Sequence, residues 1–395
     1  MSDATTPVIV SAVRTPVGKY LGGLASLPAP KLGAIVIREA VRRAGLDAAA
    51  VEEVIMGNVL QGGVGQAPAR QAAIHAGLPG TIPSVTVNKV CGSGLKAVML
   101  AAQAIKAGDE QCVVAGGMES MSNAPHYVYG MRSGIKAGNA QLVDGMIHDG
   151  LWDSFNNSHM GNLAEYTARK AGVSREDQDQ FALASHQKAV AAMEACRFKA
   201  ETVQVEIAGK KGPTVIEKDE GPRADTTLAA LAALKPSFEK DGTVTPGNAP
   251  GLNDGASALV VTGLAFAKAH GLTPLARITA YATGGGEPKD LFFAPIVAVR
   301  NLMAKAKTKI GDYALIEANE AFAVQALADG RALGWDWDRV NVNGGAIALG
   351  HPIGASGARV LTTLLYALKD RKQTTGLATL CLGGGNAVAL SVEMM

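Results

Sequence analysis

The chain is organised around one stretch that places a cysteine between a strand and a helix. That stretch reads Val87-Asn88-Lys89-Val90-Cys91-Gly92-Ser93-Gly94-Leu95-Lys96 and continues as an apolar segment to Ile105. The pattern predicts a strand that stops at Cys91, a glycine turn and a helix. Because a helix N-terminus favours negative charge, a thiolate at Cys91 would be stabilised. Cys91 is therefore either a reactive thiol or, like most cysteines, a small buried apolar residue.

The composition describes a compact enzyme rather than a fibrous or disordered chain. The 395 residues are 48% hydrophobic and 18% charged, which suits two or three domains of the α/β class. Lys and Arg together number 37 against 35 for Asp and Glu, giving a formal charge of +2 without long blocks of one sign. A broad basic face for nucleic acid is therefore not expected.

The cysteines and apolar runs indicate the compartment. The four cysteines are widely spaced and form no CxxC pair, so we expect free thiols in a reducing cytoplasm, at Cys91, Cys112, Cys196 and Cys381. The longest apolar runs, such as 256–267, are too short and too polar for a membrane span, and no export signal is visible. No metal-ligand spacing, P-loop or dinucleotide fingerprint is present, so neither a metal nor a cofactor is expected.

The first part of the chain alternates strands with helices. Residues 8–13, 51–60 and 112–117 have strand patterns, whereas 31–44 and 66–76 have helical spacing. This alternation predicts a mostly parallel sheet covered by helices. Ligands of such sheets collect at the carboxyl ends of the strands, where Cys91 and Gly117 are both expected.

A long insertion separates two similar halves. From 118 to about 250 the alternation is lost, and we expect this segment to cover the strand ends and build the substrate pocket. The alternation then returns, with strands over 277–281 and 314–318 and helices over 295–305 and 321–327. Finally, Gly354-Ala355-Ser356-Gly357 leads into a helix over 359–368, a charged turn and a strand over 377–382, in the same order as the elements around Cys91. This order indicates an internal duplication whose matching strand ends share one cleft.

Three clusters in the second half have the composition of a site. They are Asn319-Glu320-Ala321-Phe322, the glycine-rich run 344–352 that holds His351, and Cys381-Leu382-Gly383-Gly384-Gly385. Taken singly, Asn319 could cap a helix, His351 could brace a loop and Cys381 could be a buried strand residue. All three follow predicted strands of the duplicated sheet, which favours a common site.

These residues resemble the thiolases, and within that family the acetyl-CoA acetyltransferases. The matching motifs, in order, are 11–16, 57–61, 88–96, 116–121 and 251–256, followed by the three late clusters. The resemblance implies an α/β fold with two duplicated βαβαβαββ halves in a five-layered αβαβα core and a large loop domain inserted in the first half. The implied domains are residues 1–120, completed by about 250–272; the loop domain 121–249; and the C-terminal half 273–395.

The resemblance assigns a role to each residue of the clusters. Cys91 would be the acyl-accepting nucleophile, and His351 would take its proton and later hold a thioester oxygen. Cys381 would remove a proton from the α-carbon of a second acetyl-CoA. Asn319 would position a water that forms one oxyanion hole with His351, and the backbone N–H groups of Cys91 and Gly383 would form the other. This set matches the thiol and oxyanion chemistry of acyl transfer.

The resemblance also implies a groove for substrate and coenzyme A. Its expected residues are His159, Met160, Arg223, Phe238, Ala249 and Phe322. The chain departs from the family pattern at Pro250, where many members have a serine whose hydroxyl bonds the pantetheine. That hydrogen bond is therefore absent here.

The implied reaction is the reversible condensation of two acetyl-CoA molecules to acetoacetyl-CoA and coenzyme A. Coenzyme A thioesters are substrates here, without a further cofactor or metal. A homotetramer, as a dimer of dimers, is implied, with 122–136 in the contact. Three alternatives stand beside this reading: a degradative 3-ketoacyl-CoA thiolase for longer chains, a carrier-protein-dependent ketoacyl synthase, and a silent CoA- or lipid-binding relative. Cys381 argues against the second, and the presence of Cys91 and His351 against the third.

Overall fold

The chain forms two similar α/β halves. A computed structural model describes residues 2–210 and 212–395. The first half contains β1 (Pro7–Arg14), α1 (Ala29–Ala44), β3 (Glu53–Gly57), α2 (Pro68–Ala76), β4 (Ser84–Val87), α3 (Ser93–Ala107), β5 (Cys112–Ser120) and, after the insertion, β12 (Asn253–Gly263). The second contains β13 (Ala276–Gly285), α8 (Ala294–Ala306), β14 (Leu315–Ala318), α9 (Ala323–Leu333), α11 (Ile353–Asp370), β15 (Thr375–Leu382) and β16 (Asn386–Met394).

Strand register shows that the second half repeats the first. The strand orders are β1-β12-β5-β3-β4 in the first half and β13-β16-β15-β14 in the second. In the second half, the counterpart of strand β4 is reduced to a single bridge between Ile316 and Val340. Both halves carry an irregularity in the antiparallel pair next to their junction, after Ile9 in β1 and after Ile278 in β13. A shared irregularity in matching strands supports the predicted duplication. The halves join through a short antiparallel pairing of β1 with β13.

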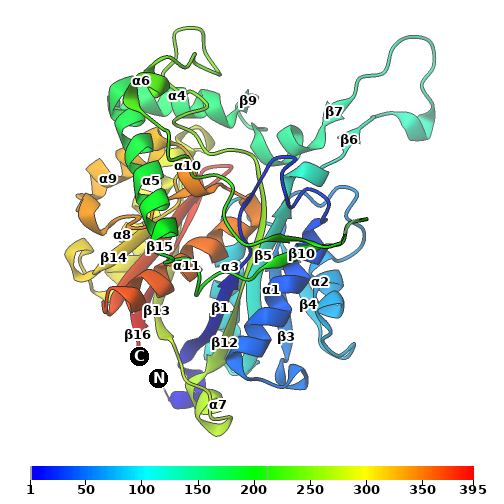
Figure 1. The fold of residues 1–395 in the computed structure, drawn as a ribbon, viewed down its shortest axis with the longest axis vertical. Helices are drawn as coiled ribbons and strands as arrows, with labels where there is room; N and C mark the ends of the chain where they lie inside the picture. Colours follow the sequence, from blue (N-terminus) through cyan, green and yellow to red (C-terminus); the bar gives the residue numbers. More distant parts are fainter. Residues whose placement is uncertain (1, 211) are drawn as a thin grey trace.

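The two sheets and their helices stack in layers (Figure 1), and three apolar clusters hold the five layers together. Alternate residues of β1 face opposite sides, since Ile9 packs in the central cluster and Val8 and Val10 pack in the outer one. The central cluster joins both half-sheets to α3 and α11, one outer cluster carries α1 and α2, and the other carries α8. The predicted αβαβα fold is thereby confirmed.

The two central helices touch along their first turns. A Cβ atom on Gly94 of α3 would lie 2.7 Å from the backbone N of Ala358, and one on Gly357 of α11 would lie 2.3 Å from the backbone N of Leu95. Only glycine permits such backbone contact. The glycines therefore bring the starts of α3 and α11 together at the carboxyl ends of the strands.

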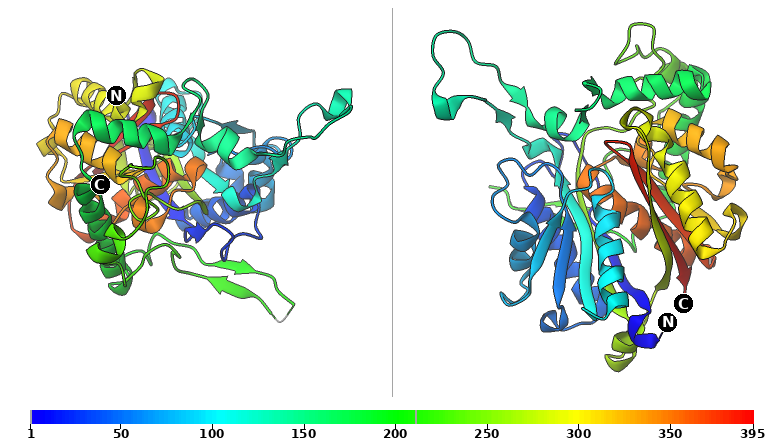
Figure 2. Two further views of the ribbon diagram at one scale, coloured as in Figure 1. Left: turned by 90° about the horizontal axis from the view of Figure 1, so that it is seen from above. Right: turned by 180° about the vertical axis from the view of Figure 1, so that it is seen from behind.

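The insertion covers this end of the molecule. It contains α4 (Met160–Ala171), α5 (Arg175–Glu194), α6 (Leu228–Ala232) and the hairpins β6 (His126–Tyr127) with β7 (Val143–Asp144), β8 (Trp152–Asp153) with β9 (Ser158–His159) and β10 (Val205–Ile207) with β11 (Thr214–Ile216). Figure 2 shows the β6–β7 and β10–β11 hairpins projecting from the body in different directions. Buried ion pairs from Arg14 to Glu201 and Asp219, both at 2.6 Å, fasten the insertion to β1.

Several predicted element bounds were wrong. The strand before the cysteine ends at Val87 rather than at Cys91, and the strand expected over 51–60 ends at Gly57. The helix expected over 359–368 begins at Ile353, since residues 353–358 also adopt helical geometry. Helix α4 and strand β16 lie where no element had been predicted. None of the described helices is long and apolar enough to cross a membrane.

Candidate active site

Cys91 lies in a strained turn just before α3. Val90 has φ of 45°, a left-handed conformation that is costly for a β-branched residue. Ser93 holds the turn, because its hydroxyl donates to the carbonyl of Val90 (2.6 Å) and accepts from the N–H of Lys89 (2.9 Å). The turn explains why the strand stops four residues before the cysteine. It presents the thiol at the helix start.

One cavity of about 480 Å³ brings the predicted site residues together from both halves and the insertion. Its walls include Cys91, His351, Cys381, Gly383, His159, Met160, Arg223, Phe238, Ala249 and Phe322. Asn319 is the exception, since it lies behind His351 and is fully buried. Its Nδ2 is 3.4 Å from Nε2 of His351, and its Oδ1 has no partner among the described residues.

His351 is held from three sides. Its backbone N–H donates to Oδ1 of Asn253 (2.8 Å), and Nδ1 lies 2.6 Å from the hydroxyl of Ser356. On the other side of the ring, Nε2 faces the amide of Asn319. The ring is 7% exposed, so its orientation is fixed by these contacts while one edge meets the cavity.

Burial controls the protonation of the site. It raises the pKa of the Cys91 thiol to about 12, although N–H groups of Cys91 and Gly383 stabilise the thiolate. Burial, with the nearby positive charge of Arg359, lowers the pKa of His351 to about 3. Burial also raises the pKa of Cys381, and the Cys91 thiol adds to this effect. The resting pair is therefore a neutral thiol and a neutral imidazole, because desolvation outweighs the predicted effect of the helix end.

The wall around Cys91 is apolar. Met146, Ile353 and the partly buried Ile147 and Leu252 belong to a cluster that packs against the cysteine. On the opposite side His159 stacks on Phe238 (ring centroids 4.9 Å apart), and an aromatic series continues through Phe322 to Phe292. His159 also caps α4, since its Nδ1 accepts the N–H of Gly161 at 3.0 Å. Such walls suit an apolar group next to the Cys91 sulfur.

A second cavity of about 430 Å³ extends the first towards the surface. The two share Arg223, Pro246, Ala249, Gly251 and Leu252. The backbone N–H of Arg223 donates to Nδ1 of His186 (3.2 Å), which anchors the Arg223 loop on α5. Together the cavities form an elongated groove that leads to the thiol.

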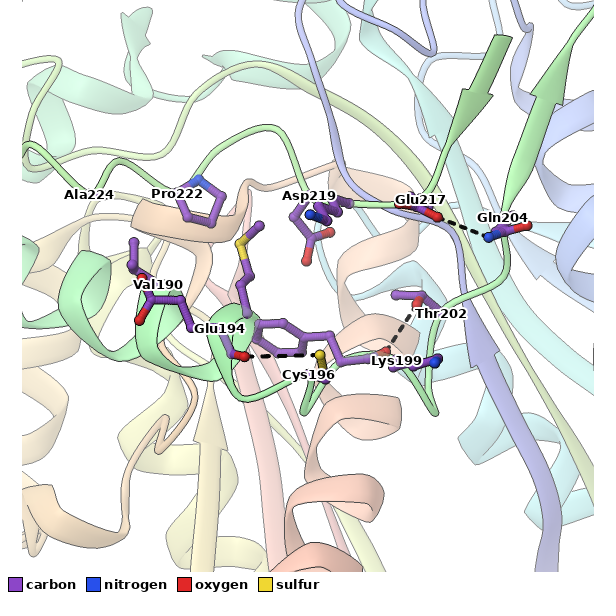
Figure 3. A pocket seen from close by; sticks show the side chains of 13 residues that line it. Val190, Glu194, Cys196, Lys199, Thr202, Gln204, Glu217, Asp219, Pro222 and Ala224 are labelled. Carbon is purple, nitrogen blue, oxygen red and sulfur yellow. Dashed lines mark hydrogen bonds between the residues drawn. The ribbon is translucent and has the colours of Figure 1, made fainter. Parts of the chain in front are cut away.

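Another cavity, of about 620 Å³, has a separate lining (Figure 3). Its lining includes the exposed Cys196 beside Glu194 and Lys199, and it shares no residue with the groove described above. Cys196 therefore has no part in the site. Within residues 2–210 and 212–395, no group of three or more His, Cys, Asp and Glu side chains is placed to hold a metal ion.

Three residues that position the site were missed in the sequence. Asn253 and Ser356 hold His351, and the buried carboxylate of Glu119 accepts from the N–H groups of Val59, Leu60 and Gly354. Ser356 carried a usable signal, because it matches Ser93 in the duplicated motif. Asn253 and Glu119 lie in the matching motifs 251–256 and 116–121, but their contacts reach residues far away in the chain, so the motifs did not indicate these roles.

Comparison with known proteins decides the family. The model described as "Thiolase, N-terminal domain" matches residues 7–264, and that described as "Thiolase, C-terminal domain" matches residues 272–394. The chain belongs to the thiolase family. Its similarity to curated thiolases covers nearly the whole chain.

Two curated relatives and one solved structure illustrate this similarity. Acetyl-CoA acetyltransferase of Pseudomonas aeruginosa is 57% identical over 386 residues, 98% of each chain, and that of Escherichia coli K12 is 54% identical over 389 residues, covering 98% of this chain and 99% of the relative. The crystal structure of the Bacillus anthracis acetyl-CoA acetyltransferase superimposes with a TM-score of 0.98 at 41% identity and covers all of both chains. The predicted family and fold are therefore confirmed.

Proposed function

We propose that this thiolase is an acetyl-CoA C-acetyltransferase that condenses two acetyl-CoA molecules reversibly to acetoacetyl-CoA and coenzyme A. The observation that carries the proposal is the convergence of Cys91, His351, Cys381 and Gly383 on one groove. Full-length relatives named acetyl-CoA acetyltransferase, at 51–57% identity, support the same assignment. The enzyme is thus an acyltransferase with coenzyme A thioesters as its substrates, and no metal or further cofactor is required.

The first half-reaction transfers an acetyl group to Cys91. The thiol proton moves to Nε2 of His351, and the thiolate attacks the thioester carbonyl of acetyl-CoA. The N–H groups of Cys91 and Gly383, which already point at the thiol, stabilise the oxyanion. The bond to the sulfur of coenzyme A then breaks, the departing thiolate takes the proton of the Cys381 thiol, and the proton from Cys91 stays on Nε2 of His351.

The second half-reaction forms the new carbon–carbon bond. The thiolate of Cys381 removes a proton from the α-carbon of a second acetyl-CoA, and the carbanion attacks the acetyl carbon on Cys91. The bond from that carbon to Cys91 breaks, and His351 returns its proton to the sulfur of Cys91, while Cys381 keeps the α-proton and is again a thiol. Because burial raises the pKa of Cys381, its thiolate is a stronger base towards a C–H bond. His351, with a water held by Asn319, stabilises the enolate oxygen.

Acyl length distinguishes this proposal from a degradative thiolase of broader range. The apolar wall near Cys91 and the Met160 side chain leave room for a short group. Thiolysis of acetoacetyl-CoA and 3-ketohexadecanoyl-CoA should be compared at matched concentrations. A higher kcat/KM for acetoacetyl-CoA is expected, and a preference for the long substrate would overturn the short-chain assignment.

The predicted domains and assembly belong to the same proposal. Residues 121–249 would act as a loop domain over the groove, between the halves 1–120, completed by about 250–272, and 273–395. The β6–β7 hairpin exposes apolar side chains, at Val128, Tyr129, Met131, Ile135 and Leu142, which supports its use as the contact of a cytoplasmic homotetramer. Light scattering should give a tetramer for the intact chain and a dimer after deletion of residues 128–142; a monomer or an unchanged tetramer would contradict this role.

A further inference from the structure

A buried ion pair lies between β14 and α11, next to the active site. Glu317 stands two residues before Asn319 on β14 and faces α11, since the residues on either side of it pack in the outer cluster. Arg359 lies on α11 one helical turn after Ser356, so both side chains leave the helix on the same side. The side chains of Glu317 and Arg359 are each 2% exposed, and Oε2 of the carboxylate lies 3.9 Å from Nη1 of the guanidinium.

The same helix and strand carry the two contacts of the His351 ring. Ser356 lies 2.6 Å from Nδ1, and Nδ2 of Asn319 lies 3.4 Å from Nε2. Each of these residues has one member of the ion pair as its neighbour, Arg359 on the helix and Glu317 on the strand. Side chains of a helix lean towards its N-terminus, which for Arg359 is the direction of His351. The ion pair is therefore the next pair of polar side chains along this seam.

The pair is not hydrogen-bonded. All three guanidinium nitrogens of Arg359 and both carboxylate oxygens of Glu317 are buried without a hydrogen-bond partner among the described residues. Burial raises the pKa of Glu317 to about 8, although the charge of Arg359 acts in the opposite direction. A guanidinium keeps its proton in a protein. At pH 7 Glu317 is therefore mostly neutral and leaves the charge of Arg359 unbalanced.

Three further charged groups act on Glu317 from the surrounding segments: Lys188 of α5, Glu201 after α5 and Glu320 after β14. Lys188 donates to two backbone carbonyls, Glu201 accepts from Arg14, and Glu320 accepts three hydrogen bonds. Glu317 has no such partner among the described residues. It is therefore the carboxyl group of this set whose charge can change without loss of a hydrogen bond.

We propose that Glu317 is a positioning residue that acts on His351 through charge: its carboxylate balances Arg359 and so allows His351 to hold the proton of Cys91 in the acyl-enzyme. Besides burial, the charge of Arg359 opposes protonation of His351. As the pH rises, Glu317 releases its proton to solvent, and no other bond changes. The imidazolium then forms more readily, and acetylation of Cys91 becomes faster. This inference rests on the proposed role of His351 as base.

The pH dependence of Cys91 acetylation tests the proposal. Glu317→Gln keeps the shape of the side chain and mimics its neutral form, so it should match the wild-type rate at pH 7. By pH 9 the wild type should be faster than Glu317→Gln by roughly 5- to 50-fold, the range for one unit charge at close range in a protein interior. Quenched-flow mixing with acetyl-CoA and mass spectrometry of the Cys91 peptide give both rates, and their ratio cancels pH effects that the two proteins share. A ratio that stays constant from pH 7 to pH 9 would overturn the proposal.

The opposite change separates charge from structure. Arg359→Met removes the positive charge and should acetylate Cys91 faster than the wild type at pH 7, whereas a purely structural role of the pair would make both variants slower. Thr362→Val is the matched control, because it removes another buried polar group of α11, bonded to Ser257, and should follow the wild type at every pH. If Arg359→Met does not fold, the ratio for Glu317→Gln decides alone.

The protonation of Glu317 can be measured without turnover. The infrared difference spectrum of the wild type minus Glu317→Gln should contain the C=O stretch of a protonated carboxyl group at pH 7, and that band should be lost by about pH 9. Absence of the band at pH 7, or its persistence at pH 9, would overturn the proposal. If the band titrates as expected while the wild type lacks thiolase activity, the proposed function fails and the charge assignment stands.

Discussion

Two loops related by the duplication, 88–94 leading into the first turn of α3 and 351–357 leading into the first turn of α11, have different functions in one reaction. Matching Ser93 with Ser356 and Gly94 with Gly357 places Cys91 opposite Gly354 and Asn88 opposite His351. Both serines donate to a backbone carbonyl at the start of their helix. The first loop thus supplies a nucleophile and the second supplies a base.

Gly354, the counterpart of Cys91, has no space for a side chain. A Cβ atom on Gly354 would lie 2.7 Å from Oε2 of Glu119 and 2.8 Å from the carbonyl of Met118. Asn88 uses its side chain to accept from the N–H of Val90, which helps to hold the Cys91 turn. The duplication has therefore produced one asymmetric site at the junction of the halves, with no room for a second thiol at Gly354.

Of the changes that test this asymmetry, removal of the Cys91 thiol should have the largest effect on activity. Cys91→Ala should reduce thiolysis of acetoacetyl-CoA by at least about 10⁴-fold, because no other group can carry the acyl intermediate. Cys196→Ala, in the remote cavity, should keep wild-type kcat and KM. Substantial acyl transfer by Cys91→Ala would show that the first loop is not the nucleophile loop.

Making the second loop like the first should have the next largest effect. His351→Asn introduces the residue found at position 88, and it removes the proton acceptor while keeping a polar side chain. We expect kcat to fall about 10²- to 10⁴-fold, the range for a lost general base. The decrease should appear in stopped-flow release of coenzyme A in the first turnover. A normal first turnover would assign the proton transfer to another group.

The lack of space for a side chain at Gly354 can be tested by measuring the stability of the protein. Gly354→Ala should lower the free energy of unfolding by roughly 1–3 kcal/mol, since the new methyl group meets backbone and a bonded carboxylate. Gly311→Ala is the control, because its Cβ atom would meet nothing within 4 Å. Urea denaturation of both variants measures the difference. Equal midpoints would show that position 354 has space for a side chain.

The smallest expected effect is a change in the reactivity of the Cys91 thiol with pH. Burial raises the pKa of Cys91 to about 12 and lowers that of His351 to about 3, so thiol and imidazole are both neutral at pH 7. The thiolate fraction of Cys91 should then rise about tenfold for each pH unit between 6.5 and 9. Alkylation of the Cys91 peptide by iodoacetamide, corrected with a small thiol, should follow that slope. A rate independent of pH would indicate a resting thiolate–imidazolium pair.

Much of the fold could be predicted from the sequence because the halves repeat. The alternating strands and helices, and the matching order around Cys91 and Ser356, indicated the duplicated sheet and placed Cys381 and His351 at its strand ends. The strand end at Val87 was missed because it depends on the left-handed turn at Val90, which β-branched residues rarely adopt. Helix α4 has buried residues at helical spacing, at Leu163, Ala164 and Thr167, but it was missed because it begins at Met160 inside a segment rich in loop residues.

The site was predictable as a set of residues but not as an arrangement. Cys91, His351 and Cys381 could be named from their motifs, whereas the contacts of Glu119 and Asn253 join segments far apart in the chain. The protonation states of the site residues could not be predicted from the sequence either, because they depend on burial in the folded protein. The helix end alone suggested a thiolate, and desolvation reverses that expectation.

Trapping the acyl intermediate tests the central claim most directly. The enzyme should be mixed with acetyl-CoA, quenched in acid and digested, and the cysteine peptides should be measured by mass spectrometry. We predict an acetyl adduct on the peptide that carries Cys91, absent from the Cys91→Ala variant and retained in Cys196→Ala. No adduct at Cys91, or acetylation of another cysteine that persists in Cys91→Ala, would contradict the account.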